Sequence, residues 1–135
     1  MSSFREVKSA EKSAMQQAQV IVELNTVVKD IERCERTIVD LQKDLESVNA
    51  KHKDRKTTRE DIAYLEDLLK CANKKLTWEK HIASLQKRTP AILERMSQVM
   101  NDSVNPPPDE TRAQMLQALQ SIQVAMERLQ KAKVE

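Results

Sequence analysis

The chain has 135 residues, a length typical of one domain, and it contains no glycine, which excludes the glycine-dependent loops that hold phosphates and dinucleotides. Its net charge of +2 is too small for the basic surface that nucleic-acid binding needs. Because aromatic residues make up only 2% of the chain, its core must be aliphatic and thin, as in a helical bundle or a coiled coil.

The first predicted element is a helix from about residue 3 to about residue 52. Apolar side chains recur there at steps of three and four residues, which is the spacing of one face of a helix. This stripe begins at Val7, passes through Leu24 and ends at Val48. Neither proline nor a cluster of turn residues interrupts it, so we expect one long and continuous helix.

A polar segment, residues 51–59 (KHKDRKTTR), follows the first helix and carries five basic side chains against one acidic. Thr57 precedes Glu60 by three residues and Thr58 precedes Asp61 by three, and either pair matches the capping pattern of a helix start. We therefore expect a turn at about 53–57 and a second helix from about residue 58. The alternative is one uninterrupted helix that crosses the polar segment.

The second predicted helix covers about 58–101 and has an apolar stripe of its own, which begins with Ile62, Leu65 and Leu69. Pro90 lies inside this helix, and proline removes one backbone donor and clashes with the preceding turn. Since the apolar stripe keeps its phase across Pro90, we expect a kink near this residue and not a break.

A linker is predicted at 102–108, where three consecutive prolines favour extended polyproline geometry. A third helix is expected over about 109–132. Asp109 and Glu110 at its start and Lys131 near its end suit the dipole of a helix, which favours acidic groups at the N-terminus and basic groups at the C-terminus.

Together these elements predict an all-α fold in one helical domain, residues 1–135. A long antiparallel helical hairpin forms a coiled-coil stalk, and its other end joins the third C-terminal helix in a three-helix bundle head. A turn near residue 55 brings Leu45 opposite Leu65 and Leu41 opposite Leu69, so the two apolar stripes are expected to face each other. The stalk then projects from the head with the basic segment at its tip.

Residues with catalytic or ligand-binding chemistry are sparse. His52 and His81 have no partner at the spacing of a metal motif, and the carboxylates are spaced as solvated charges on helix faces. We therefore expect no enzymatic activity, no cofactor and no metal site. Cys34 and Cys71 are expected to be buried thiols, with a regulatory disulfide between them as the alternative.

Two regions are candidates for partner binding. The basic tip suits acidic protein tails or anionic lipid headgroups, and the alternative is a solvated turn. The head is poor in charge, because residues 13–22, 96–101 and 113–126 contain no charged side chain. The alternative for the head is a solvated, glutamine-rich face around an ordinary core, and Trp78 is either a core residue where head meets stalk or an exposed anchor for a partner. The candidate residues are Lys51, Lys53, Arg55, Lys56 and Arg59 in the tip, Met15, Val20, Val22, Val99, Met100, Met115 and Leu116 in the head, and Trp78.

These features favour a non-catalytic coiled-coil adaptor or structural subunit of a larger cytoplasmic protein complex, which binds partner helices through the charge-poor head and the flanks of the stalk. The alternative is a monomeric, chaperone-like module that binds acidic surfaces or lipid headgroups through the tip. We expect helical or acidic protein partners in a homo- or hetero-oligomer, without a small-molecule substrate or nucleic acid. No apolar run is long enough to span a membrane, and no signal-peptide stretch is present, so a cytoplasmic location is expected, with the nucleus and the cytoskeleton as alternatives.

Overall fold

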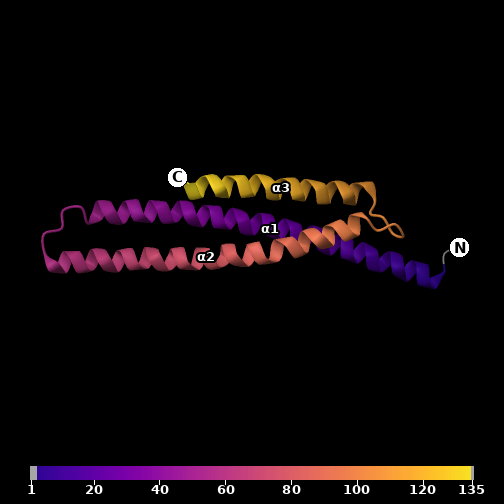
Figure 1. Ribbon diagram of the computed structural model, residues 1–135, viewed down its shortest axis with the longest axis horizontal. Helices are drawn as coiled ribbons and strands as arrows, with labels where there is room; N and C mark the ends of the chain where they lie inside the picture. Colours follow the sequence, from indigo (N-terminus) through magenta and orange to yellow (C-terminus); the bar gives the residue numbers. More distant parts are fainter. Residues whose placement is uncertain (1–2, 135) are drawn as a thin grey trace.

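The computed structural model describes residues 3–134, and all regular structure in that range is helical. Three helices follow one another along the chain: α1 (Phe4–Lys51), α2 (Thr58–Met100) and α3 (Asp109–Val134). Figure 1 shows that α2 runs antiparallel to α1 and that α3 runs parallel to α1. Both α2 and α3 pack mainly against α1. The predicted all-α fold, a helical hairpin with a third helix, is confirmed.

The start of α1 is capped by Ser3. The Ser3 hydroxyl oxygen accepts a hydrogen bond of 3.1 Å from the Glu6 amide, and the Glu6 carboxylate accepts one of 3.1 Å from the Ser3 amide. This reciprocal pair is a capping box, which satisfies two backbone donors that the first turn leaves free. The side chains of residues 3–12 are exposed, because the first turns of α1 project beyond the other two helices (Figure 1).

The turn between α1 and α2 is held by side chains from both of its ends. The Thr57 hydroxyl oxygen accepts a hydrogen bond of 3.2 Å from the Glu60 amide and so caps α2 at the first of the two positions that the sequence allows. The Arg55 guanidinium donates to the carbonyl oxygen of His52 at 2.7 Å and to the carboxylate of Asp61 at 3.1 Å. These contacts tie the turn to the last residues of α1 and the first turn of α2.

Pro90 lies inside α2, which stays helical on both sides of it. Proline has no amide hydrogen, so the carbonyl one turn earlier, at Gln86, loses its donor. The Thr89 hydroxyl donates a hydrogen bond of 2.6 Å to the carbonyl oxygen of Leu85, one turn before it. Figure 1 shows α2 bending as it approaches its C-terminal end, and proline is a usual cause of such a bend.

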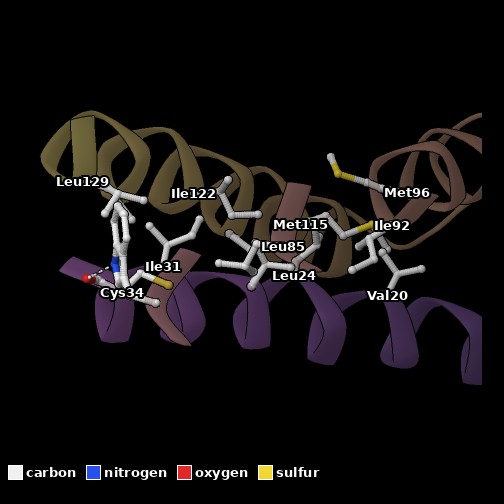
Figure 2. Close-up of a cluster of buried hydrophobic side chains, with 14 residues drawn as sticks. Val20, Leu24, Ile31, Cys34, Leu85, Ile92, Met96, Met115, Ile122 and Leu129 are labelled. Carbon is white, nitrogen blue, oxygen red and sulfur yellow. Dashed lines mark hydrogen bonds between the residues drawn. The ribbon is translucent and has the colours of Figure 1, made fainter. Parts of the chain in front are cut away.

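The hydrophobic core lies in the head, where all three helices contribute. Leu24, Val27 and Ile31 of α1 and Met115 of α3 are at most 1% exposed. Figure 2 shows Met115, Ile122 and Leu129 of α3 above Leu24 and Ile31 of α1, with side chains of α2 between them. The other buried members of this core are Val20, Cys34, Trp78, Leu85, Ile92, Met96, Ala118 and Ala125.

The face of α2 that packs on α1 differs from the face expected from the sequence. The buried residues of α2 include Cys71, Trp78, Leu85 and Ile92, which recur every seven residues. The expected pairing of Leu45 with Leu65 and of Leu41 with Leu69 is wrong, because four large apolar side chains of the α2 stripe expected to face α1 are 52–61% exposed. Those four side chains are Ile62, Leu65, Leu69 and Leu76.

The length of α3 sets the boundary between head and stalk. The Gln42 side-chain amide of α1 donates a hydrogen bond of 2.9 Å to the carbonyl oxygen of Ala132, so α3 ends at the level of Gln42. At the other end, the linker crosses α1, where the buried Gln17 donates to the carbonyl oxygen of Asn105 at 3.4 Å. Beyond Gln42 the stalk consists of α1 and α2 alone, with the turn at its tip (Figure 1).

Candidate binding surfaces

A ladder of ion pairs joins α1 and α2 along one flank of the hairpin, which we call the inner ladder. Successive ion pairs, or rungs, are separated by seven or fourteen residues on both helices. Each exposed ion pair contributes roughly 0.2–1 kcal/mol to the stability of the fold. The ladder therefore matters more for the register between α1 and α2 than for their stability. The rungs are Lys51–Asp67 at 3.5 Å, Asp44–Lys74 at 2.5 Å, Asp30–Arg88 at 3.2 Å, and Glu23–Arg95.

One rung of the inner ladder is replaced by neutral or weakly basic side chains. Thr37 and His81 occupy the positions where the seven-residue interval would place an ion pair. They line a pocket of about 250 Å³ beside Trp78 and Cys34. The Trp78 indole nitrogen donates a hydrogen bond of 2.8 Å to the carbonyl oxygen of Cys34, drawn as a dashed line next to Cys34 in Figure 2. At this level the packing and hydrogen bond of Trp78 hold the two helices together, and the described residues form no ion pair there.

At the tip, His52 is buried between the two helices. Its Nε2 atom lies 2.7 Å from the carboxylate of Asp67, and its ring lies 5.4 Å from the ring of Tyr64. The hydrogen bond from His52, aided by the positive charge of Lys51, holds the pKa of Asp67 below its usual value. The Tyr64 hydroxyl donates to the Asn49 side chain at 2.7 Å. Polar contacts therefore close the end of the stalk.

Of the five cations expected to form the basic tip, two are engaged within the chain. Lys51 pairs with Asp67, and the Arg55 guanidinium lies 3.9 Å from the centre of the Tyr64 ring as well as bonding to Asp61. The remaining three are exposed and form no ion pair with any residue from 3 to 134. They are Lys53, Lys56 and Arg59. The tip is thus a smaller positive surface than the sequence indicates.

Two of the head residues expected to bind a partner lie in the core, and so does Trp78, which takes the first of its two expected roles. Val20, Met115 and Trp78 are 3%, 0% and 6% exposed, so none of them offers a surface to another molecule. The reason is that they point into the contact between the helices, where Trp78 also finds its hydrogen-bond acceptor on Cys34. A lack of charge in these stretches marks buried helix faces as well as exposed ones.

The other expected head residues are divided between two environments. Met15 on α1 is 74% exposed, Val22 is 57% exposed, and Leu116 on α3 is 49% exposed. Val99 and Met100 of α2 are partly buried and pack against the core. Part of the charge-poor head is therefore an uncharged outer surface, but it does not form one continuous apolar patch through all the expected residues.

An exposed apolar seam runs along α2, on the stripe that the sequence assigns to the inside of the hairpin. Two series of residues make up this outer seam, each with a period of seven and offset from the other by three. This is the a/d spacing of a coiled coil. The first series is Ile62, Leu69, Leu76, Ala83 and Pro90; the second is Leu65, Ala72, Glu79, Gln86 and Leu93.

The outer seam lies across α2 from the face that contacts α1. Its first series precedes the buried series by two residues throughout, since Leu69 comes two residues before Cys71 and Leu76 two before Trp78. Two residues correspond to a rotation of about 200° around an α-helix. The second series follows the buried series by one residue, or about 100°, so the seam covers the back and one side of α2. In the stalk, α2 is therefore apolar on two faces, and only one of them is covered by α1.

In the head the outer seam leads into a groove between α2 and α3. The groove holds about 360 Å³ and is lined on the α2 side by Gln86, Pro90 and Leu93 of the seam. Met126 of α3 forms part of the opposite wall, and Ile31 of α1 contributes to the floor. The groove exists because α2 and α3 both pack on α1 and make few contacts with each other. The seam thus continues from the stalk into the head, with the polar side chains of Glu79 and Gln86 between its two apolar ends. At the head end Leu93 is partly buried against the core.

Cys34 and Cys71 are both free and buried, and burial raises the pKa of the Cys34 thiol, with the charge of Asp30 adding to the effect. No group of three or more His, Cys, Asp or Glu side chains within residues 3–134 is placed to hold a metal ion. Among the same residues, no helix has the length and apolar character needed to cross a bilayer.

Comparisons of the chain with protein-family models, with curated proteins and with solved structures find no significant match. The geometry of the chain itself therefore carries the functional proposal. The residues that sequence reasoning missed are those of the outer seam, which it placed against α1. The signal that distinguishes the two faces is the seven-residue series Tyr64, Cys71, Trp78, Leu85 and Ile92, which runs beside the more apolar stripe.

Proposed function

We propose that this protein is a non-catalytic helical adaptor or structural subunit of a larger cytoplasmic assembly, and that it binds a partner helix along the outer seam of α2. The observation that supports this proposal is the exposure of Ile62, Leu65, Leu69 and Leu76, each more than half accessible and all on one side of one helix. A helix that is apolar on opposite faces is typical of one that is buried on both.

The energetics favour a partner on this surface. Covering the exposed part of each of these four side chains contributes roughly 1 kcal/mol, estimated from about 25 cal/mol per Å² of apolar surface. Contiguous apolar patches of this kind mark interaction sites or cause aggregation when they stay uncovered. The a/d spacing further specifies the shape of the partner, since an amphipathic helix presents side chains at matching intervals.

The basic tip is the second candidate surface, with Lys53, Lys56 and Arg59 available for acidic partners. Its case is weaker than that of the seam because Lys51 and Arg55 are already engaged within the chain. The two surfaces lie on different parts of the stalk, so one experiment distinguishes them.

The test is photo-crosslinking in cells that express the protein, with a photoreactive amino acid placed at Leu69 in one variant and at Lys53 in another. We expect the Leu69 variant to form a discrete crosslinked product and the Lys53 variant to form none. A third variant, with the probe at the exposed Lys43 of α1, measures background. Absence of any product from Leu69 above that background would show that the proposed function is wrong, and a product from Lys53 alone would favour the tip.

A further inference from the structure

We propose that the helix which covers the outer seam is α2 of a second copy of this chain, packed antiparallel in a symmetric dimer. This inference rests on the proposed function and identifies the partner for the same surface. The two-fold axis passes between Thr77 and Trp78, at the middle of the seam. The seam from Ile62 to Leu93 is 32 residues long, or about 48 Å at 1.5 Å per residue, so the whole of it is covered in this register.

In an antiparallel coiled coil, residues of the first series of one helix face residues of the second series of the other. About the proposed axis, the apolar start of the seam meets its apolar end, and the two small alanines meet near the middle, where they let the helices approach closely. Each layer occurs twice by symmetry. The layers are Ile62 with Leu93, Leu65 with Pro90, Leu69 with Gln86, Ala72 with Ala83, and Leu76 with Glu79, the second residue in each being that of the second copy.

This arrangement also fills the groove in the head. Leu93 and Pro90 line that groove together with Met126 of α3. The stalk end of the second copy, with Ile62 and Leu65, enters there, and its own α1 lies on the far side of α2, away from the contact. The two-helix stalk of each copy thus gains its missing cover from the head of the other.

The charges beside the seam select this register. Five charged residues flank one edge of the seam at intervals of seven or multiples of it, and none of them has an ion pair anywhere in residues 3–134. They are Arg59, Glu66, Lys80, Lys87 and Glu94. In the proposed dimer Arg59 lies beside Glu94 of the second copy, and Glu66 beside Lys87. Symmetry doubles these to four interchain ion pairs.

Neighbouring registers bring like charges together. In the proposed register Lys80 faces the uncharged Asn73 of the second copy. A shift by one heptad in one direction places Glu66 beside Glu94 and Lys80 beside Lys80 of the second copy. A shift in the other direction keeps an attractive pair, Glu66 with Lys80, but places Arg59 beside Lys87. Like charges at such positions oppose association, which is how coiled coils choose their register. The charges of the inner ladder already have partners within the chain, so of these two sets only the charges on the seam edge are free to pair with a second copy.

The experiment measures the mass of the purified full chain by light scattering after size exclusion, and its dissociation constant by sedimentation. We expect a particle of twice the 15.5 kDa of one chain. Arg59→Glu and Glu94→Arg each replace two interchain ion pairs by two like-charge contacts, so each variant should dissociate at about tenfold higher concentration or more. The double variant, Arg59→Glu with Glu94→Arg, should recover the dimer.

Mixing the two single variants gives an independent readout. In an equimolar mixture, an Arg59→Glu chain and a Glu94→Arg chain bring opposite charges together at both contacts between positions 59 and 94. Heterodimers should therefore form where neither variant alone dimerises. Both positions are exposed and free of ion pairs within the described chain, and far-UV circular dichroism of each variant checks that the helices are retained.

The outcomes separate this inference from the proposed function. A monomeric chain whose Leu69 probe crosslinks a different protein overturns the second copy as occupant and leaves the function standing. A dimer that neither the double variant nor the mixture restores overturns this register and with it the inference. Absence of both a dimer and a crosslink from Leu69 overturns both.

Discussion

The indole nitrogen of Trp78 donates a hydrogen bond to the backbone carbonyl oxygen of Cys34, and both residues are buried between α1 and α2. This contact sets the rotation of α2, because the indole can reach that carbonyl only when the series containing Cys71, Trp78 and Leu85 faces α1. The outer seam is exposed as a direct consequence. One polar atom on one large side chain therefore decides which of the two apolar faces of α2 is left for a partner.

Truncation of Trp78 should be costly for this reason. We expect Trp78→Ala to lower the free energy of unfolding by about 3–5 kcal/mol, the range for removing a buried aromatic side chain. Trp78→Phe keeps most of the volume but leaves the Cys34 carbonyl without this donor, and should cost about 1–2 kcal/mol. Urea unfolding followed by circular dichroism measures both, with the exposed Lys80→Ala as control. Equal stability of Trp78→Ala and the control would contradict the assigned rotation.

The Asp67 carboxylate should make stability depend on pH at the tip. Its pKa in the folded chain is lowered below the usual 3.8, first by the hydrogen bond from His52. A lowered folded pKa means that the carboxylate stabilises the fold above the unfolded pKa, and that this contribution is lost as the pH falls through the folded pKa. Asp67→Asn should therefore be less stable than the natural chain at neutral pH, and the difference should shrink below about pH 3.8.

Thermal unfolding at a series of pH values measures this difference. Asp54→Asn removes the same charge from the exposed turn, where Asp54 has no ion pair with any described residue, and serves as the matched control. A difference in stability between the natural chain and Asp67→Asn that stays constant down to pH 2 would show that the Asp67 carboxylate does not cause the pH dependence.

The helices and the cap at the start of α2 were predictable from the sequence because their causes are local. Thr57 and Glu60 form the expected cap, and the steps of three and four residues indicate the helices without reference to anything outside them. The packing face of α2 was not predictable in the same way. Its outer face carries Leu65 and Leu69, which are more apolar than Tyr64 and Cys71 on the buried face, so hydrophobicity alone favours the wrong side.

Prediction of the candidate binding sites required the same distinction between covered and exposed helix faces. Absence of charge drew attention to Val20 and Met115, but uncharged residues occur on a covered face as readily as on a binding face, and both of these are buried. The exposed seam was visible as a stripe and was assigned to the hairpin interface, since a single chain offered it no other partner. What decides between the faces is a long-range contact, Trp78 to Cys34, that no local pattern contains.

The Cys34 thiol should be unreactive in the folded chain. It is 4% exposed, and burial raises its pKa, so both access and the thiolate fraction are low near neutral pH. Alkylation by iodoacetamide at pH 7.5 should label Cys34 slowly in buffer and rapidly in denaturing urea, as read by peptide mass spectrometry. A variant with one cysteine added at the exposed Ser47 gives the rate for an accessible thiol. Equal rates at Cys34 and the added cysteine in the folded chain would contradict its burial.

Two leucines on different helices test the packing of the hairpin most directly. Leu24 on α1 is fully buried in the head, and Leu69 on α2 is 61% exposed on the outer seam. Leu24→Ala should lower the free energy of unfolding by about 2–5 kcal/mol, because it removes buried methyl groups and leaves a cavity. Leu69→Ala should change it by no more than about 0.5 kcal/mol in the monomer, as for other surface positions.

The comparison is made in the Arg59→Glu background at low protein concentration, so that association through the seam does not add to the stability of the fold. Chemical unfolding of the two variants then reports packing within one chain alone. If Leu69 faced Leu41 across the hairpin, as the sequence pattern suggests, Leu69→Ala would cost several times more than the surface value and approach the cost of Leu24→Ala. A small effect at Leu69 together with a large one at Leu24 would place the seam on the outside of the molecule, free to receive a partner helix.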